Sequence, residues 1–174
     1  MVILENWRKN VDLNLQNPYD VIEENELDYS FLTKDGIAYR AYFLSASHLH
    51  DSFTDAYSFS IEPVGDTEDT IHPMDIRISM TIAYILKEFF RKNENSMLMV
   101  CDNMDGKEEK RRKLFDRWYH VYNNHSIIKL DASLENEDYR LFVSMFINRT
   151  NPKRELLIAA FNELVRTDLY ELGI

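Results

Sequence analysis

The chain has 174 residues, of which 45% are hydrophobic and 13% aromatic, so we expect one domain with a packed core over residues 1–174. Its formal net charge of −10 disfavours a general nucleic-acid-binding protein, which would need a broad basic surface. The charge is uneven, because residues 1–75 hold fifteen acidic and four basic side chains, whereas residues 76–174 hold fifteen acidic and sixteen basic ones. A local basic patch in the second half is compatible with the acidic total.

Three features favour a soluble cytoplasmic protein that does not contact a membrane. The single cysteine, Cys101, cannot form an intramolecular disulfide, which is typical of a reducing compartment. The N-terminal segment lacks the charged-then-apolar order of a signal peptide. The apolar runs, such as Met97–Cys101, are far too short to span a bilayer.

The first third of the chain reads as a β-meander. Residues 1–17 are an uncertain N-terminal extension, but from Tyr19 apolar side chains alternate over residues 19–44 in a pattern that predicts three antiparallel strands. Asp35-Gly36 is a strong two-residue hairpin signal within that segment. A polar loop then leads to a fourth strand, in which Tyr57, Phe59 and Ile61 alternate and which Pro63 and Gly65 end.

Two helices and a strand follow. Pro73 suits a first helical turn, and helical spacing predicts a core face of Ile78, Ile82, Ile85, Leu86 and Phe89. The opposite face is predicted to contain Arg77, Thr81, Glu88 and Arg91. Met97–Cys101 is apolar at every position, which indicates a central strand covered on both faces. A second helix is predicted from about Lys107 to Tyr122, with a core stripe of Leu114, Phe115, Trp118 and Tyr122.

The last third predicts two strands and a helix. Ile127, Ile128 and Leu130 indicate a short strand, and residues 139–147 a long one in which Phe142 and Phe146 face away from Leu141, Val143 and Met145. Asn151-Pro152 is typical of an N-cap followed by proline in the first turn of a closing helix. The whole order predicts an α+β fold, with an antiparallel-dominated sheet of about six to seven strands and about three helices.

Two resemblances cover this order. The chain resembles an uncharacterised bacterial family of unknown function at Pro18-Tyr19, Asp35-Gly36, Tyr39 and residues 29–31, 57–63, 100–119 and 151–164, which is nearly its full length. Its element order is also similar to the core of the GCN5-related N-acetyltransferase fold. The first resemblance implies no activity, and the second implies an acyl-coenzyme A site before the first helix.

The coenzyme motif of that second family is missing. The family binds the pyrophosphate with Gln/Arg-x-x-Gly-x-Gly/Ala, but the corresponding residues 70–75 contain no glycine that would let the backbone approach a phosphate. Asp66, Glu68, Asp69 and Asp75 would also repel it. We therefore expect no cofactor. A V-shaped gap between parallel strands at residues 57–62 and 96–101 would nevertheless favour an enzyme, whereas a gap filled by side chains would not.

The predicted helix that begins near Lys107 is strongly basic. Lys110, Lys113 and Arg117 share its outer flank, whereas Lys107 and Arg111 continue the core-facing line. Cations near the positive end of a helix dipole require an opposing charge, so Lys107 and Arg111 are candidates for binding a phosphate or carboxylate. In the alternative interpretation, Asp102, Asp105 or the acidic first half neutralises them, and their stems pack on the core.

Two further clusters have a chemical and a plain interpretation. His48, His50 and Asp51 resemble half of a zinc site, but no third or fourth ligand has a matching spacing, so a polar surface loop and no metal are expected. Cys101 ends a central strand near a helix N-terminus and would be a nucleophile with His72 as its base, yet buried free cysteines are ordinary core residues.

Two classes of function remain. The first is a soluble intracellular binding domain without catalytic activity, whose acidic half or basic helix engages an unknown protein or a small anionic ligand. Tyr42, Tyr57 and Tyr139 are candidates for such a partner surface. The alternative is an acyltransferase-like protein, or its degenerate descendant, with a small-anion site near the helix that starts at Lys107. An oligomer is compatible with either class.

Overall fold

The computed structural model describes residues 17–65, 75–102, 108–135 and 140–167. Seven strands form one sheet in the order β1-β2-β3-β4-β5-β7-β6, and every neighbouring pair is antiparallel except β4 and β5. The described part also contains three helices, so the α+β prediction is confirmed. The strands are β1 Val21–Asn25, β2 Asp28–Leu32, β3 Ala38–Ser45, β4 Ala56–Pro63, β5 Ser96–Asp102, β6 Ile127–Glu135 and β7 Arg140–Asn148. The helices are α2 Ile76–Phe89, α3 Glu108–Tyr122 and α4 Arg154–Arg166.

The predicted meander is present, but its second turn is longer than a two-residue hairpin. Leu32 pairs with Ala38, the N–H of Thr33 donates to the carbonyl of Ile37, and the N–H of Gly36 donates to the carbonyl of Thr33. Gly36 has a φ of 77°, a left-handed conformation that glycine adopts at little cost. The connection is therefore a three-residue loop closed by a glycine, and the glycine determines its position.

Strand β5 lies in the middle of the sheet and separates two apolar cores. Met97, Met99 and Cys101 point into the first core, whereas Leu98 and the half-buried Val100 belong to the second. Because strand side chains alternate between faces, a strand that is apolar at every position must be covered on both sides. The predicted central strand is thereby confirmed.

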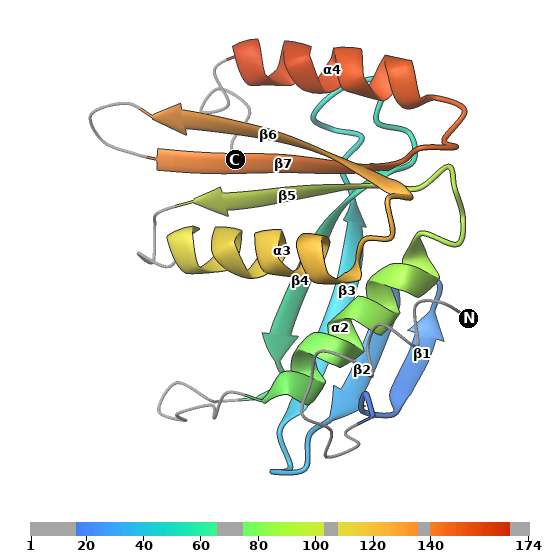
Figure 1. The fold of residues 1–174 in the computed structure, drawn as a ribbon, viewed down its shortest axis with the longest axis vertical. Coiled ribbons are helices and arrows are strands. Elements are labelled where there is room, and N and C mark those ends of the chain that lie inside the picture. Colours follow the sequence, from blue (N-terminus) through green and yellow to red (C-terminus); the bar gives the residue numbers. More distant parts are fainter. Residues whose placement is uncertain (1–16, 66–74, 103–107, 136–139, 168–174) are drawn as a thin grey trace.

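The helices are divided between the two faces of the sheet. Helices α2 and α3 cover the first core through Ile82, Ile85, Phe89, Phe115 and Trp118, and they lie in front of the strands in Figure 1. Helix α4 covers the second core through Leu157, Ala160, Phe161 and Leu164, along β6 and β7. Phe142 and Phe146 of β7 face the first core, and Leu141, Val143 and Met145 face the second, as predicted.

Helix α2 differs from its prediction at two points. Asp75 is its N-cap, and its carboxylate accepts the N–H of Arg77, so the helix begins after Pro73, which lies outside the described residues. Thr81, predicted on the solvent face, is fully buried. The hydroxyl of Thr81 accepts the N–H of Tyr19 and donates to the carbonyl of Arg77. Burial of this hydroxyl depends on a partner 62 residues away, which helical spacing does not reveal.

Helix α4 begins at Arg154, three residues after the asparagine predicted to cap it. The side-chain oxygen of Asn151 accepts the N–H of Lys153, and its carbonyl accepts the N–H of Arg154. Asn151 therefore caps the turn that opens the helix, while its amide group also donates to the carbonyl of Glu94. Strand β6 is longer than predicted, because it pairs with β7 along its whole length.

Candidate functional site

The only parallel pair among the described strands, β4 and β5, separates after three residue pairs. Ala56, Tyr57 and Ser58 pair with residues 96–98, but β4 continues to Pro63 and β5 to Asp102 without further pairing between these two strands. The carboxyl ends of two parallel strands therefore diverge in the middle of the sheet. This divergence is the V-shaped gap that would favour an acyltransferase-like protein.

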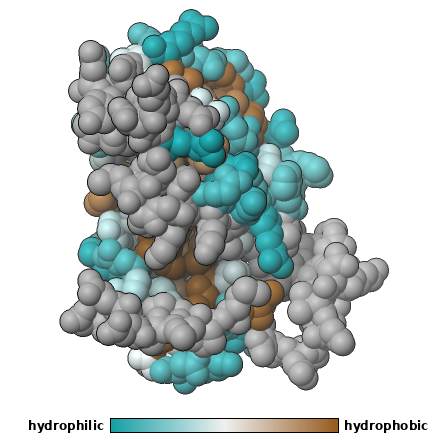
Figure 2. All heavy atoms as spheres, turned by 90° about the vertical axis from the view of Figure 1, so that its left-hand side faces the viewer, coloured by the Kyte–Doolittle hydropathy of each residue, from teal (hydrophilic) through white to brown (hydrophobic). Residues whose placement is uncertain are grey.

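Aromatic side chains fill the gap on the face that α3 covers. Phe59 follows Ser58, the last residue of β4 that pairs with β5, and is 8% exposed. Its ring centroid lies 5.9 Å from that of Phe115 on α3. On the opposite face, Ser60 and Val100 are only half-buried. Figure 2 shows the side toward which β5 and β6 run in Figure 1, and apolar atoms are visible there in a hollow. The opening is closed on one face of the sheet and more accessible on the other.

The N-terminus of α2 already holds a carboxylate. Asp75 caps the helix through one carboxylate oxygen and accepts a hydrogen bond from the hydroxyl of Tyr19 through the other. The guanidinium of Arg77 lies 3.9 Å from the centroid of the Tyr19 ring, and its Nε donates to the carbonyl of Asn17 at 2.7 Å. A helix N-terminus attracts anions, and here the chain supplies its own.

Two tyrosines near this cap have a raised pKa. Burial raises the pKa of Tyr19, and the hydrogen bond to Asp75 raises it further because the phenol donates the proton. The pKa of Tyr39 is also raised, first by burial and then by the negative charge of Asp75. Both phenols are therefore held in the neutral form, and that of Tyr19 donates to the carboxylate that caps α2.

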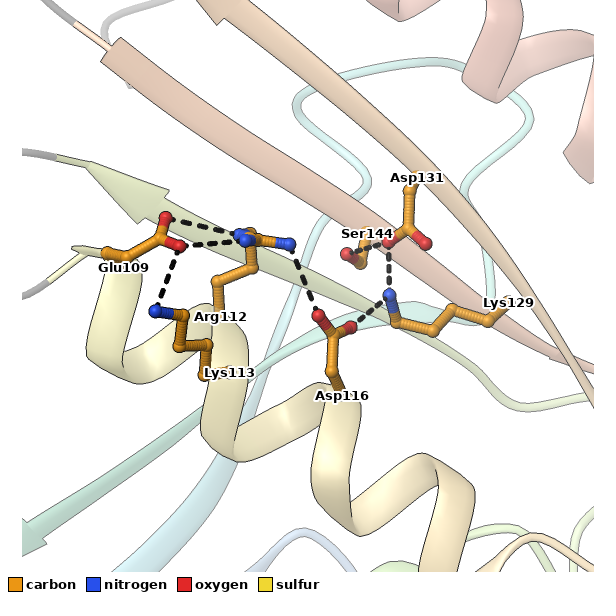
Figure 3. A network of polar contacts seen from close by, with 7 residues as sticks. All are labelled: Glu109, Arg112, Lys113, Asp116, Lys129, Asp131 and Ser144. Carbon is orange, nitrogen blue, oxygen red and sulfur yellow. Dashed lines mark hydrogen bonds and ion pairs between the residues drawn. The ribbon is translucent and has the colours of Figure 1, made fainter.

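Two of the three α3 cations whose side chains are described pair with carboxylates of the same helix. Arg112 pairs with Glu109 at 2.8 Å and Asp116 at 3.3 Å, and Lys113 pairs with Glu109 at 3.5 Å. The guanidinium of Arg112 also lies 4.9 Å from the centroid of the Phe142 ring. The hydrogen bond from Arg112 keeps the pKa of Glu109 below its ordinary value. Figure 3 shows these ion pairs at the side of α3 that faces β6 and β7.

Lys129 of β6 extends the same network. Its side chain is 7% exposed and contacts Asp116 at 2.7 Å as well as Asp131, which also accepts a hydrogen bond from the hydroxyl of Ser144. The six charged side chains in Figure 3 comprise three cations and three anions, so their charges cancel. Such a network positions α3 on the sheet and has no surplus positive charge for an added anion.

The two residues predicted to bind an anion are not tested by this geometry. Lys107 lies outside the described residues, and so does the side chain of Arg111. Asp105 and the side chain of Asp102, the partners in the alternative interpretation, are likewise outside. The described neighbours Arg112 and Lys113 pair with carboxylates of the helix itself. The anion site remains a prediction.

Two polar contacts connect the segment that contains His48, His50 and Asp55 to α4 and its N-cap. The ring of His50 accepts the N–H of Ser52 through Nδ1, and its Nε2 lies 3.2 Å from the Glu163 carboxylate. Lys153, the N-cap residue of α4, pairs with Asp55 at 2.9 Å, and the hydrogen bond from Lys153 lowers the pKa of the Asp55 carboxyl. His48 is exposed, and no group of three metal-ligating side chains occurs among the described residues.

Two residues that sequence patterns assigned to surface or chemistry belong to the core. Phe53, in the loop predicted to be polar, is fully buried against the α4 side of the sheet. Cys101 is 1% exposed in the other core, and His72, its suggested base, lies outside the described residues.

Tyr57 packs edge-on against Phe89 in the first core, so it is not part of an exposed strand face, and Tyr139 lies outside the described residues. Of the three tyrosines proposed for a partner surface, Tyr42 is the one that the structure places on an exposed sheet face.

That face, the bare sheet face, is formed by the outward side chains of β1–β4. None of its members is buried. It comprises Ile22, Glu24, Asp28, Ser30, Leu32, Ala38, Arg40, Tyr42, Leu44, Ser58, Ser60 and Glu62. Helix α4 and the loop before β4 cover only the other half of the same side of the sheet, up to Ala46 and Ala56. The alternation of apolar residues predicts these strands but does not indicate what covers their polar positions.

The model of a Family of unknown function (DUF6169) matches residues 74–163. The matched segment begins just before α2 and ends within α4, so strands β1–β4 precede it. No curated protein and no solved structure matches the chain. In the described part of the chain, every helix is too short or too polar to cross a membrane.

Proposed function

Since the chain belongs to the Family of unknown function (DUF6169), which supplies no activity, we propose that it is a non-catalytic protein-binding domain that works in the cytoplasm. The partner binds the bare sheet face. The observation that supports this proposal is the unequal covering of one side of the sheet. Helix α4 covers β6 and β7, whereas none of the outward side chains of β1–β4 is buried.

The composition of the bare sheet face fits a binding surface. Ile22 and Leu32 are 60% exposed and Leu44 is 55% exposed, which places three large aliphatic side chains on one sheet face. Between them, Arg40 forms a two-pronged ion pair with Asp28 and lies 4.6 Å from the centroid of the Tyr42 ring. Aliphatic side chains around a fixed arginine and a tyrosine are typical of protein interfaces.

The partner we propose is a protein rather than a nucleic acid. A formal net charge of −10 repels a phosphate backbone, and the cations of α3 that the structure describes are largely engaged in ion pairs. The absence of catalysis is part of the proposal and is supported by the α2 cap. The position that would hold a coenzyme pyrophosphate in an N-acetyltransferase is occupied by the carboxylate of Asp75.

Affinity capture from a lysate of the native host tests the proposal. Three baits are compared: the wild type, the double variant Ile22→Glu/Leu32→Glu, and the control Leu156→Glu, whose leucine is 52% exposed on α4. We expect at least one protein to be about tenfold depleted with the double variant and unchanged with the control. If every captured protein is retained equally by all three baits, the bare sheet face is not the binding surface.

A second candidate is acyl-coenzyme A binding in the opening between β4 and β5. The divergence after Ser58 and Leu98 and the hollow on that side of the molecule favour it. Trp118 adds a suitable reporter, because its ring lies 4.7 Å from Phe115 and its N–H has no acceptor among the described residues. A ligand in the opening would change the surroundings of this indole.

Fluorescence of a Trp7→Phe variant isolates Trp118, since the chain has two tryptophans. Titration with acetyl-coenzyme A and, separately, with inorganic phosphate is expected to leave the emission unchanged if the chain is only a protein-binding domain. A saturable change with acetyl-coenzyme A would favour the second candidate. A change with phosphate that Lys107→Ala/Arg111→Ala abolishes would instead establish the predicted anion site.

A further inference from the structure

We infer that the bare sheet face binds an amphipathic helix of a partner protein whose flanks are basic. The inference rests on the proposed function and adds the shape and the charge of the occupant. Three observations support it: a row of exposed aliphatic side chains, nearby acidic side chains without an ion pair among the described residues, and an area that fits one helix.

The aliphatic row crosses three strands at one end of the face. Leu32 of β2 lies opposite Ala38 of β3, and the N–H of Val64 donates to the carbonyl of Ala38, so the row continues past the end of β4. Leu32 is 60% exposed and Val64 57%. Ile22 of β1 pairs with Ser30, the outward neighbour of Leu32, and adds a further side chain at 60% exposure. Exposed aliphatic side chains in contiguous positions mark a contact surface more strongly than scattered ones.

The charges around this row are mainly negative. Asp28 is paired with Arg40, and the hydrogen bond keeps the pKa of Asp28 below its ordinary value. Glu62 lies opposite Arg40 on β4, and Glu24 lies on β1 with only the hydroxyl of Ser30 at 3.5 Å. One cation among four charged side chains leaves the face with two net negative charges. A partner with lysine or arginine beside its aliphatic stripe would complement them.

The size of the face selects a helix rather than a second copy of the chain. Four strands at about 4.8 Å spacing, two of them about 17 Å and two about 27 Å long, give a flat area of roughly 400 Å². A stable dimer buries about 800 Å² on each partner, which is about twice this area. A single helix about 10 Å wide fits it. Helix α4 already covers the other half of this side in the same manner, with Leu157 and Phe161 against the sheet.

A display library of 16-residue peptides tests the occupant directly. Each peptide has a fixed leucine stripe at helical spacing, and the flanking positions are randomised. The full-length wild type is the target, and clones that also bind Ile22→Glu/Leu32→Glu are removed. We expect the enriched flanks to be rich in lysine and arginine, and a selected peptide to lose about 10- to 100-fold in affinity with the double variant. Leu156→Glu should bind it as the wild type does.

The acidic side chains are tested separately with the selected peptide. Glu24→Lys/Glu62→Lys should weaken its binding, whereas Asp51→Lys, at an exposed position away from the face, should not. The inference would be overturned if the enriched peptides lacked basic flanks. It would also be overturned if Ile22→Glu/Leu32→Glu left their affinity unchanged. A dimer in sedimentation that Leu32→Glu dissociates would overturn it as well, because a second copy would then be the occupant.

Failure of this inference differs from failure of the proposed function. If no library peptide binds the face but the affinity capture still yields a protein that only the double variant loses, the partner binds this face without a basic helix. The inference is then wrong and the proposed function stands. If neither experiment depends on Ile22 and Leu32, both are wrong.

Discussion

The hydroxyl of Tyr19 donates a hydrogen bond to the carboxylate of Asp75, the residue that caps helix α2. The contact joins the chain just before β1 to the start of a helix 56 residues later. It also fills the helix N-terminus with a carboxylate of the chain itself. Residues 70–75, which precede α2, contain no glycine, and the last of them supplies this carboxylate.

Removing the cap should destabilise the protein measurably. Asp75→Ala deletes the acceptor for the Arg77 N–H and for the Tyr19 hydroxyl, so we expect a loss of about 1–2 kcal/mol in the free energy of unfolding. Asp75→Asn retains the cap and should cost less. Urea denaturation measures both. An unchanged stability of Asp75→Ala would show that the cap is unimportant.

The raised tyrosine pKa values predict a loss of stability in alkaline solution. Tyr19, Tyr29 and Tyr39 each have a folded-state pKa above the ordinary value of 10.0, with burial as the largest cause. Their contribution is fully present below that value. It is lost as the pH rises from there through the folded-state pKa, because the unfolded chain releases these protons first.

Unfolding curves recorded between about pH 8 and pH 11 test this. Tyr19→Phe/Tyr39→Phe should flatten the alkaline loss relative to the wild type. Tyr42→Phe, on the bare sheet face and not among the causes of these three shifts, serves as the control and should leave the pH dependence as it is. An equally steep loss in the double variant would contradict the assignment to these phenols.

The Lys129 network should hold α3 on the sheet. Lys129→Met leaves Asp116 and Asp131 facing each other without the cation that both contact, so we expect a loss of about 1–3 kcal/mol. The added change Asp116→Asn should restore part of it in a double-mutant cycle. Lys113→Met removes a 70% exposed lysine from the same helix and should cost less than about 0.5 kcal/mol.

Phe53 should be among the most important residues of the loop before β4. Its side chain is fully buried, so Phe53→Ala is expected to destabilise the protein by about 3–5 kcal/mol. Leu44→Ala, at a position 55% exposed on β3, should cost far less. Thermal and urea unfolding compare the two. Similar losses for both variants would mean that the loop does not anchor α4 through Phe53.

Much of the fold follows from local patterns, and the exceptions have a common cause. Met97–Cys101 and the alternation of Phe142 and Phe146 identified β5 and β7, because burial on a given face leaves a regular period. Thr81, Phe53 and Lys129 were missed because each depends on a partner distant in sequence. A buried hydroxyl, an apolar residue in a polar loop and a lysine within a strand have no periodic pattern.

The candidate site was predicted less completely than the fold. The basic helix was predicted from composition, and the element order identified residues 57–62 and 96–101 as the strands between which a gap would favour an enzyme. The pairing of Arg112 with Glu109 and Asp116 follows helical spacing but was not predicted, and the participation of Lys129 depends on the β6–β7 register. The bare sheet face follows from what α4 leaves uncovered, which strand patterns alone do not state.

The most direct test of the proposed function is photo-crosslinking from the bare sheet face in living cells. A benzoylphenylalanine residue replaces Tyr42 on the face in one variant and Tyr84 on α2 in a second, matched variant. We predict a discrete protein adduct from position 42 and none from position 84. Adducts from position 84 with none from position 42 would contradict the assignment of the bare sheet face as the partner surface.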